Sequence, residues 1–124
     1  MTTPARLASV ALLIWGLQPQ SDPAAVADAF FDRLVKRDFA GAIAMGNANL
    51  LRTMSEDKLR ELWAALGAQA GPYQSRDTGT VAPAGNGHAV TIRATFGLIQ
   101  ADVVIGVVEG RVSGLAVRPG SRPS

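Results

Sequence analysis

The chain has 124 residues, of which 48% are hydrophobic and 18% charged, and this length and composition are those of one small globular domain. Twelve Lys and Arg residues against ten Asp and Glu residues give a net charge of +2, without the basic clusters that nucleic-acid binding needs. No nucleic-acid partner is therefore expected. The absence of cysteine excludes disulfides, thiolate metal sites and a lipid-modified cysteine.

An apolar run stands near the start of the chain. Residues 7–17 (LASVALLIWGL) follow Arg6, the only charge before them, and precede the polar, turn-forming segment 18–21. A stable membrane span takes about 20 apolar residues, so this run is too short for one. Its layout is typical of a secretory signal peptide. We therefore predict a signal peptide over 1–21, a secreted or periplasmic domain over 22–119 and a tail over 120–124.

Two alternatives remain open for this segment. The apolar run could instead be a buried first helix of the domain, although neither a polar face nor a cap accompanies it. The cleavage site is also open, because Ala25-Val26-Ala27 fits the small-residue pattern better than the position near Ser21. Cleavage after Ala27 would remove the start of the next helix, so the earlier position is preferred.

The first helix of the domain is predicted from Asp22, because a capping carboxylate here precedes Pro23 at the first helical position. Apolar residues then recur at helical spacing while charged residues take the opposite side, so one side of the helix faces a core. The core-facing residues are Ala27, Phe30, Phe31, Leu34 and Val35. Asp38 predicts the cap of a second, short helix over 39–45.

A third helix is predicted after a break. Gly46, Asn47 and Asn49 indicate that the chain is not helical beyond the second helix. Ser55 is a typical N-cap and Gly71-Pro72 a typical stop, so the third helix should span 56–70. Its apolar residues again fall on one side, and they are Leu59, Leu62, Trp63 and Leu66.

Beyond Pro72 the apolar period changes to two. Residues 88–96 alternate between an apolar and a polar face, and Asn86-Gly87 before them is a strong hairpin signal. Residues 73–81 should therefore form the antiparallel neighbour of 88–96, and the glycine-rich stretch 79–87 a hairpin loop. Two further strands are predicted, over 100–108 and 111–117. Helices followed by a strand meander predict an α+β fold, with N-terminal helices packed on a curved antiparallel four-stranded sheet.

Several segments resemble one known family. Residues 54–75 (MSEDKLRELWAALGAQAGPYQS), 101–103 (ADV) and 110–115 (GRVSGL) are similar to the pattern of a bacterial domain family of unknown function with the nuclear-transport-factor-2-like, cystatin-like cone fold. The resemblance covers about 24–119. In that family the domain stands alone behind a signal peptide or precedes an α/β-hydrolase domain, which implies a non-enzymatic accessory or binding module. The chain has no G-x-S-x-G nucleophile elbow, so it resembles the solitary form.

A cone between sheet and helices would enclose a cavity with an apolar lining. Aromatic and apolar side chains dominate such pockets, so a small apolar or amphipathic ligand is expected. The candidate ligand-binding residues are Trp63, Leu66, Tyr73, His88, Ile92 and Phe96. Each of them could equally be ordinary core, and side chains could fill the cavity.

Residues capable of catalysis are few. His88 is the only histidine, and without cysteines or a cluster of carboxylates it cannot form a metal site or a triad, so a structural role is favoured. Asp102 could act as a general base in the cone, as carboxylates do in related folds. Counting back through the turn at Gly97-Leu98, however, places Asp102 opposite Arg93, where a cross-strand ion pair is favoured. No catalytic residue, metal or cofactor is therefore expected.

Three functional hypotheses follow from the sequence. The favoured one is a secreted, non-enzymatic module that binds a small apolar ligand or a protein partner, and that forms a homodimer through Val104 and Val108 on the outer sheet face. The second is an isomerase- or hydrolase-like enzyme that uses Asp102. The third is a structural envelope protein that keeps its leader as an anchor.

Overall fold

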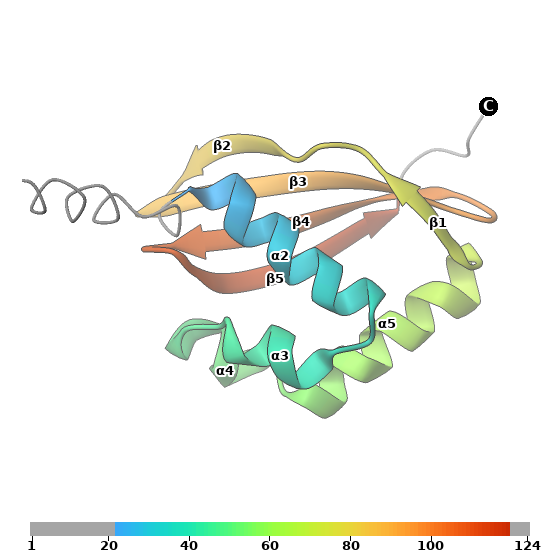
Figure 1. The fold of residues 1–124 in the computed structure, drawn as a ribbon, viewed down its shortest axis with the longest axis horizontal. Coiled ribbons are helices and arrows are strands. Elements are labelled where there is room, and N and C mark those ends of the chain that lie inside the picture. The colour runs from blue at the N-terminus through green and yellow to red at the C-terminus, as the bar shows by residue number, and fades with distance from the viewer. Residues whose placement is uncertain (1–21, 120–124) are drawn as a thin grey trace, which may run out of the picture.

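The computed structural model describes residues 22–119 (Figure 1). Its elements in chain order are α2 (Pro23–Val35), α3 (Phe39–Ala44), α4 (Ala48–Thr53), α5 (Glu56–Ala70), β1 (Tyr73–Arg76), β2 (Thr80–Ala84), β3 (Gly87–Phe96), β4 (Gln100–Val108) and β5 (Arg111–Pro119). Helices precede one antiparallel sheet, so the predicted α+β class is confirmed. The predicted signal peptide (1–21) and tail (120–124) lie outside the described residues. Within 22–119, no helix is long and apolar enough to cross a bilayer.

Side-chain caps begin the helices as the sequence predicts. Asp22 accepts a hydrogen bond from the backbone N–H of Ala24 at 3.0 Å. Asp38 caps α3 and Ser55 caps α5 in the same way, through the N–H groups three residues further on. These bonds satisfy donors that the first helical turn leaves unpaired.

Helix α4 was not expected from the sequence. The prediction of a break at Gly46, Asn47 and Asn49 is wrong beyond residue 47, because Asn47 caps a new helix that contains Asn49. The Asn47 side chain accepts from the N–H of Leu50 at 3.1 Å, and Leu50 is buried. Asparagine can stand at the end of one helix or at the beginning of another, and here the burial of Leu50 favours the beginning of a helix.

The sheet has five strands rather than the four predicted. Both β1 and β2 pair with β3, along different parts of one edge, and the order across the sheet is β1-β3-β4-β5. The segment predicted as one strand over 73–81 is divided, and most of the expected loop over 79–87 is strand β2. At the junction, a Cβ on Gly79 would lie 2.7 Å from Cγ1 of Val90, so only glycine lets the chain pass this close to β3. The hairpin turn itself comprises Gly85, with φ +58°, and Asn86.

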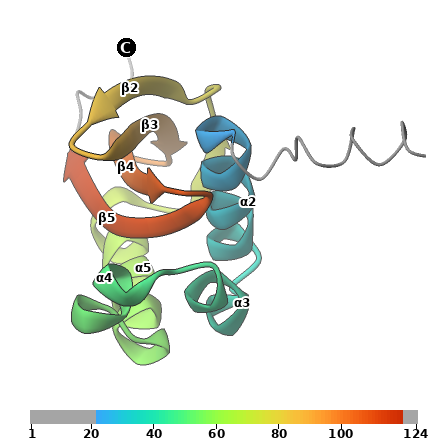
Figure 2. The same ribbon diagram turned by 90° about the vertical axis from the view of Figure 1, so that its left-hand side faces the viewer.

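One face of the sheet packs against the helices. Figure 2 shows the sheet curled, with α2 and α5 packed against it. Alternate residues of β3 and β4 are buried on that face, and the buried residues of α2 lie opposite them. These core residues are Val26, Ala27, Phe30, Phe31, Leu34, Val90, Ile92, Ala94, Phe96, Ala101, Val103, Ile105 and Val107.

The outer sheet face carries the predicted ion pair. Arg93 and Asp102 are cross-strand partners, and Nε of Arg93 lies 3.0 Å from Oδ1 of Asp102. The hydrogen bond from Arg93 holds the pKa of Asp102 below its usual value. The cross-strand interpretation of this pair is therefore confirmed.

Arg76 joins the first strand to the first helix. Its guanidinium lies 2.7 Å from a carboxylate oxygen of Asp28 and 3.4 Å from one of Asp32. The guanidinium also stacks over the Phe31 ring, with Cζ of Arg76 5.3 Å from the ring centroid. Burial lowers the pKa of Arg76, but the hydrogen bond to Asp28 and the negative charges of Asp28 and Asp32 together outweigh burial, so the pKa is raised. Arg76 thus stays charged and holds β1 against α2.

Replacing Arg76 by methionine should therefore destabilise the domain. We expect a loss of about 1 to 2 kcal/mol, because Met keeps the apolar stem but loses the ion pairs and the cation–π contact. Urea unfolding followed by circular dichroism measures it. The Arg76→Lys variant keeps the charge but not the planar stacking, so its stability should lie between that of the unmodified protein and that of Arg76→Met. Equal stability of all three proteins would contradict this role.

Candidate functional site

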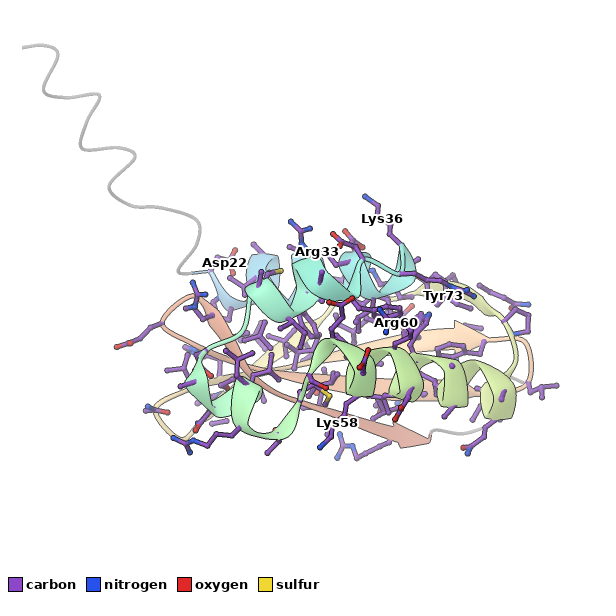
Figure 3. All side chains as sticks on the ribbon, turned by 90° about the horizontal axis from the view of Figure 1, so that it is seen from below. Asp22, Arg33, Lys36, Lys58, Arg60 and Tyr73 are labelled. Atoms are coloured by element: carbon purple, nitrogen blue, oxygen red, sulfur yellow. The ribbon has the colours of Figure 1, made fainter. Side chains whose placement is uncertain are left out.

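A large hollow lies between the C-terminal end of α2, the helix α5 and the adjoining ends of β1 and β3. Its volume is about 670 Å³, inside the range of small-molecule sites, roughly 300 to 1,000 Å³. We call it the α2–α5 pocket, and its lining residues are Val35, Arg37, Phe39, Arg60, Trp63, Ala64, Gly67, Pro72, Tyr73 and Phe96. Figure 3 shows Arg60 and Tyr73 in the space between α2 and α5.

Three aromatic residues from three elements meet in this pocket. Trp63 comes from α5, Tyr73 begins β1 and Phe96 ends β3, and Tyr73 and Phe96 are cross-strand partners. Ring centroids are 6.2 Å apart for Trp63 and Phe96, 5.8 Å for Tyr73 and Phe96, and 6.4 Å for Trp63 and Tyr73. The buried Phe31 supports the cluster from α2, edge-on to Trp63 and Tyr73. Mutual contacts of this kind hold an apolar surface in a fixed shape.

Tyr73 adds a neutral polar group to the aromatic surface. Burial raises the pKa of its phenol above the usual value. The hydroxyl therefore stays protonated near neutral pH, where it can both donate and accept a hydrogen bond.

Two arginines lie on the rim of the pocket. Arg60 on α5 pairs with Glu56 at 2.8 Å and with Asp57 at 2.7 Å, and its guanidinium lies over the Phe39 ring. Hydrogen bonds to Asp57 and Glu56 raise its pKa, so it is held both in place and in its charged form. Arg37 follows Lys36, the C-cap of α2, and is exposed to solvent.

Three of the six predicted binding residues are brought together. Trp63, Tyr73 and Phe96 line the α2–α5 pocket. Leu66 instead lines a separate hollow of about 230 Å³ between α5 and the ends of β4 and β5. Ile92 is fully buried in the core.

His88 does not belong to the same site. It is exposed at the opposite end of β3 from Phe96, and eight residues of strand separate the two by about 26 Å. The expectation that His88, Leu66 and Ile92 line one cavity with the aromatic residues is therefore wrong. Period-two alternation places residues on the same face of a strand, but it does not say at which end the helices leave a space.

Asp102 also lies away from this pocket. It is on the outer sheet face, beside a shallow hollow of about 360 Å³ that Asp77, Thr80 and Arg93 also line. Its pKa is lowered, whereas a general base for carbon acids or water needs a raised one. The expectation of Asp102 inside the space between sheet and helices is wrong, because residue 102 alternates with the buried Ala101 and Val103.

Sequence reasoning missed Arg37, Arg60, Phe39 and Gly67 as pocket residues. Charged residues on a helix are usually solvated, and the position of Phe39 in the sequence predicts only the packing of a short helix. Across residues 22–119, no group of three or more His, Asp or Glu side chains is placed to hold a metal ion.

One family model matches this sequence. It is described as "Protein of unknown function (DUF3887)", and it matches residues 27–108. The chain belongs to this family. The DUF3887 match begins in α2 and ends with β4, so every residue that lines the α2–α5 pocket lies inside it. No curated protein and no solved structure was found to match the chain.

Proposed function

We propose that this DUF3887 protein is a secreted or periplasmic, non-enzymatic binding module that holds a small, largely apolar molecule in the α2–α5 pocket. The observation that carries the proposal is the shared aromatic surface of Trp63, Tyr73 and Phe96 beside a hollow of about 670 Å³. Ordinary cores close over aromatic side chains, whereas Trp63 and Tyr73 remain partly exposed here. Binding would cover them.

The resemblance to cone-fold domains supports the same proposal. Helices against one face of a curled sheet are the arrangement of the nuclear-transport-factor-2-like cone, to which we assign the fold by analogy. In that architecture a space between sheet and helices serves as a ligand site. The accessory role that this resemblance implies fits a module that binds and does not react. Secretion rests on the predicted signal peptide at 1–21.

A homodimer through the outer sheet face is a second candidate. Val104 and Val108 of β4 lie on this face and are half-buried in the single chain. Their outward position is what supports an apolar contact with another protein copy. The ion pair of Arg93 and Asp102 lies on the same face, and it would have to stay solvated at the edge of such a contact.

Filling the pocket tests the ligand proposal directly. Gly67 lines the pocket on α5, and a Cβ built there meets nothing within 4 Å. Leucine favours helix and would project into the hollow, so Gly67→Leu should fold normally while excluding a ligand. We expect its affinity for the neutral fluorescent probe N-phenyl-1-naphthylamine to fall about tenfold or more.

The matched control for this experiment is Gly67→Ala. One methyl group leaves most of the space open, so probe affinity should remain close to that of the unmodified protein. Probe fluorescence is titrated for all three proteins, and circular dichroism confirms that each is folded. Equal affinity of the Leu and Ala variants would contradict binding in the α2–α5 pocket.

A further inference from the structure

The rim of the α2–α5 pocket is positively charged. Arg37 and Arg60 line it, and no Asp or Glu is among the lining residues that the structure describes. The remaining lining is apolar or aromatic apart from the neutral Tyr73 hydroxyl. The hollow therefore has an apolar body and a cationic edge.

The two arginines differ in how their charge is used. Arg60 is bound by Glu56 and Asp57, which stand behind it on the same helix, and it stacks on Phe39. Arg37 appears in none of the ion pairs within 4.0 Å found across residues 22–119. The neighbouring Asp38 forms an ion pair with Arg33, with a nitrogen–oxygen distance of 2.7 Å. Arg37 is thus the lining cation whose charge is not offset.

The backbone at Arg37 is that of a position that favours glycine. Its φ is +61°, and it follows the C-cap of α2 in a Schellman motif. The N–H of Arg37 donates to the carbonyl of Leu34 at 3.0 Å, and the N–H of Asp38 donates to that of Arg33 at 2.8 Å. A side chain with a Cβ is disfavoured in this conformation. Arginine therefore stands where helix termination alone would select glycine, and such positions cluster at functional sites.

Lys36 offers a contrast one residue earlier. It has the same charge and is exposed, but Figure 3 shows it pointing away from the space that holds Arg60 and Tyr73. Both residues of this turn therefore carry a positive charge, but of Lys36 and Arg37 only Arg37 lines the pocket.

We propose that the ligand of the α2–α5 pocket is a single-chain amphiphile with a carboxylate head, whose chain lies on Trp63, Tyr73 and Phe96 and whose head binds the guanidinium of Arg37. This inference rests on the proposed function and specifies its ligand. A carboxylate fits because a guanidinium binds it through two parallel hydrogen bonds. One unpaired cation matches one negative charge, whereas a doubly charged phosphate head would leave a charge without a partner.

The test compares two probes of equal chain length, decanoate and decanol, by isothermal titration calorimetry on the full chain. We expect decanoate to bind about tenfold tighter than decanol, because a charge-assisted hydrogen bond replaces a neutral one. Arg37→Gly should reduce decanoate affinity about tenfold and leave decanol affinity unchanged. The same variant should shift the urea midpoint upwards, since glycine relieves the backbone at position 37, so unfolding cannot explain the loss.

Two further variants separate the possible failures. Lys36→Gln removes a charge that points out of the pocket, so it should leave both affinities unchanged; a loss equal to that of Arg37→Gly would overturn the inference in favour of general charge attraction. Decanoate and decanol binding equally to the unmodified protein, but not to Gly67→Leu, would overturn the carboxylate head while the proposed function stands. Binding of neither probe, or equal binding to Gly67→Leu, would overturn both.

Discussion

Replacing Phe31 by alanine is expected to lower the free energy of unfolding by about 3 to 5 kcal/mol. Phe31 is fully buried in α2, and its ring is edge-on to Trp63, with centroids 6.1 Å apart, and to Tyr73, with centroids 5.8 Å apart. The guanidinium of Arg76 covers the same ring. Alanine leaves a cavity at the point where α2, α5 and β1 meet. Since domains are stable by only about 5 to 15 kcal/mol, the variant should be close to unfolding.

The Phe31→Leu variant separates volume from aromatic geometry. Leucine fills much of the space but offers no ring edge or face, so the expected loss is about 1 to 2 kcal/mol. Urea denaturation, followed by far-ultraviolet circular dichroism, gives both values. If the two variants were equally unstable, the aromatic contacts rather than the filled volume would support the pocket wall.

Signals that act over short distances along the chain predicted much of the fold. A cap is a contact between neighbours in sequence, so Asp22, Asp38 and Ser55 could be recognised without tertiary information. The register of β3 against β4 could be counted because a short turn fixes it, and the pairing of Arg93 with Asp102 follows.

Elements that depend on distant contacts were not predictable in this way. Asn47 is compatible with either the end or the beginning of a helix, and the burial of Leu50 against the rest of the core selects the latter. The division of 73–81 into two strands depends on how closely Gly79 passes Val90, which no local pattern encodes.

The residues of the candidate site also include some that could be predicted from the sequence and some that could not. Trp63, Tyr73 and Phe96 could be proposed because aromatic residues are frequent in ligand pockets. The two arginines of the rim could not be proposed from the sequence, because Arg37 and Arg60 look like ordinary solvated charges of two helices. Only the arrangement of α2 relative to α5 turns them toward one space.

A single glycine fixes the relation between α5 and the strands that complete this pocket. Gly71 ends α5 with φ +90° and ψ −178°, a conformation that other residues rarely adopt. The turn between β3 and β4 docks directly on it, since the N–H of Leu98 donates to the carbonyl of Ala70 at 2.7 Å and that of Gly97 to the carbonyl of Pro72 at 2.9 Å. A Cβ at Gly71 would lie 3.1 Å from Gly97 Cα, so the turn would have to move.

We therefore expect Gly71→Ala to destabilise the domain by about 1 to 3 kcal/mol, measured by urea unfolding. Gly67→Ala, one turn earlier on α5, is the matched control, because its methyl group enters open space inside a regular helix and should stabilise by about 0.5 to 1 kcal/mol. Opposite signs for the same substitution on one helix would show that backbone conformation, and not helix propensity, determines the effect at Gly71. The pocket provides a second readout: movement of the docked turn displaces Phe96 relative to Trp63, so Gly71→Ala should weaken N-phenyl-1-naphthylamine binding in the protein that remains folded.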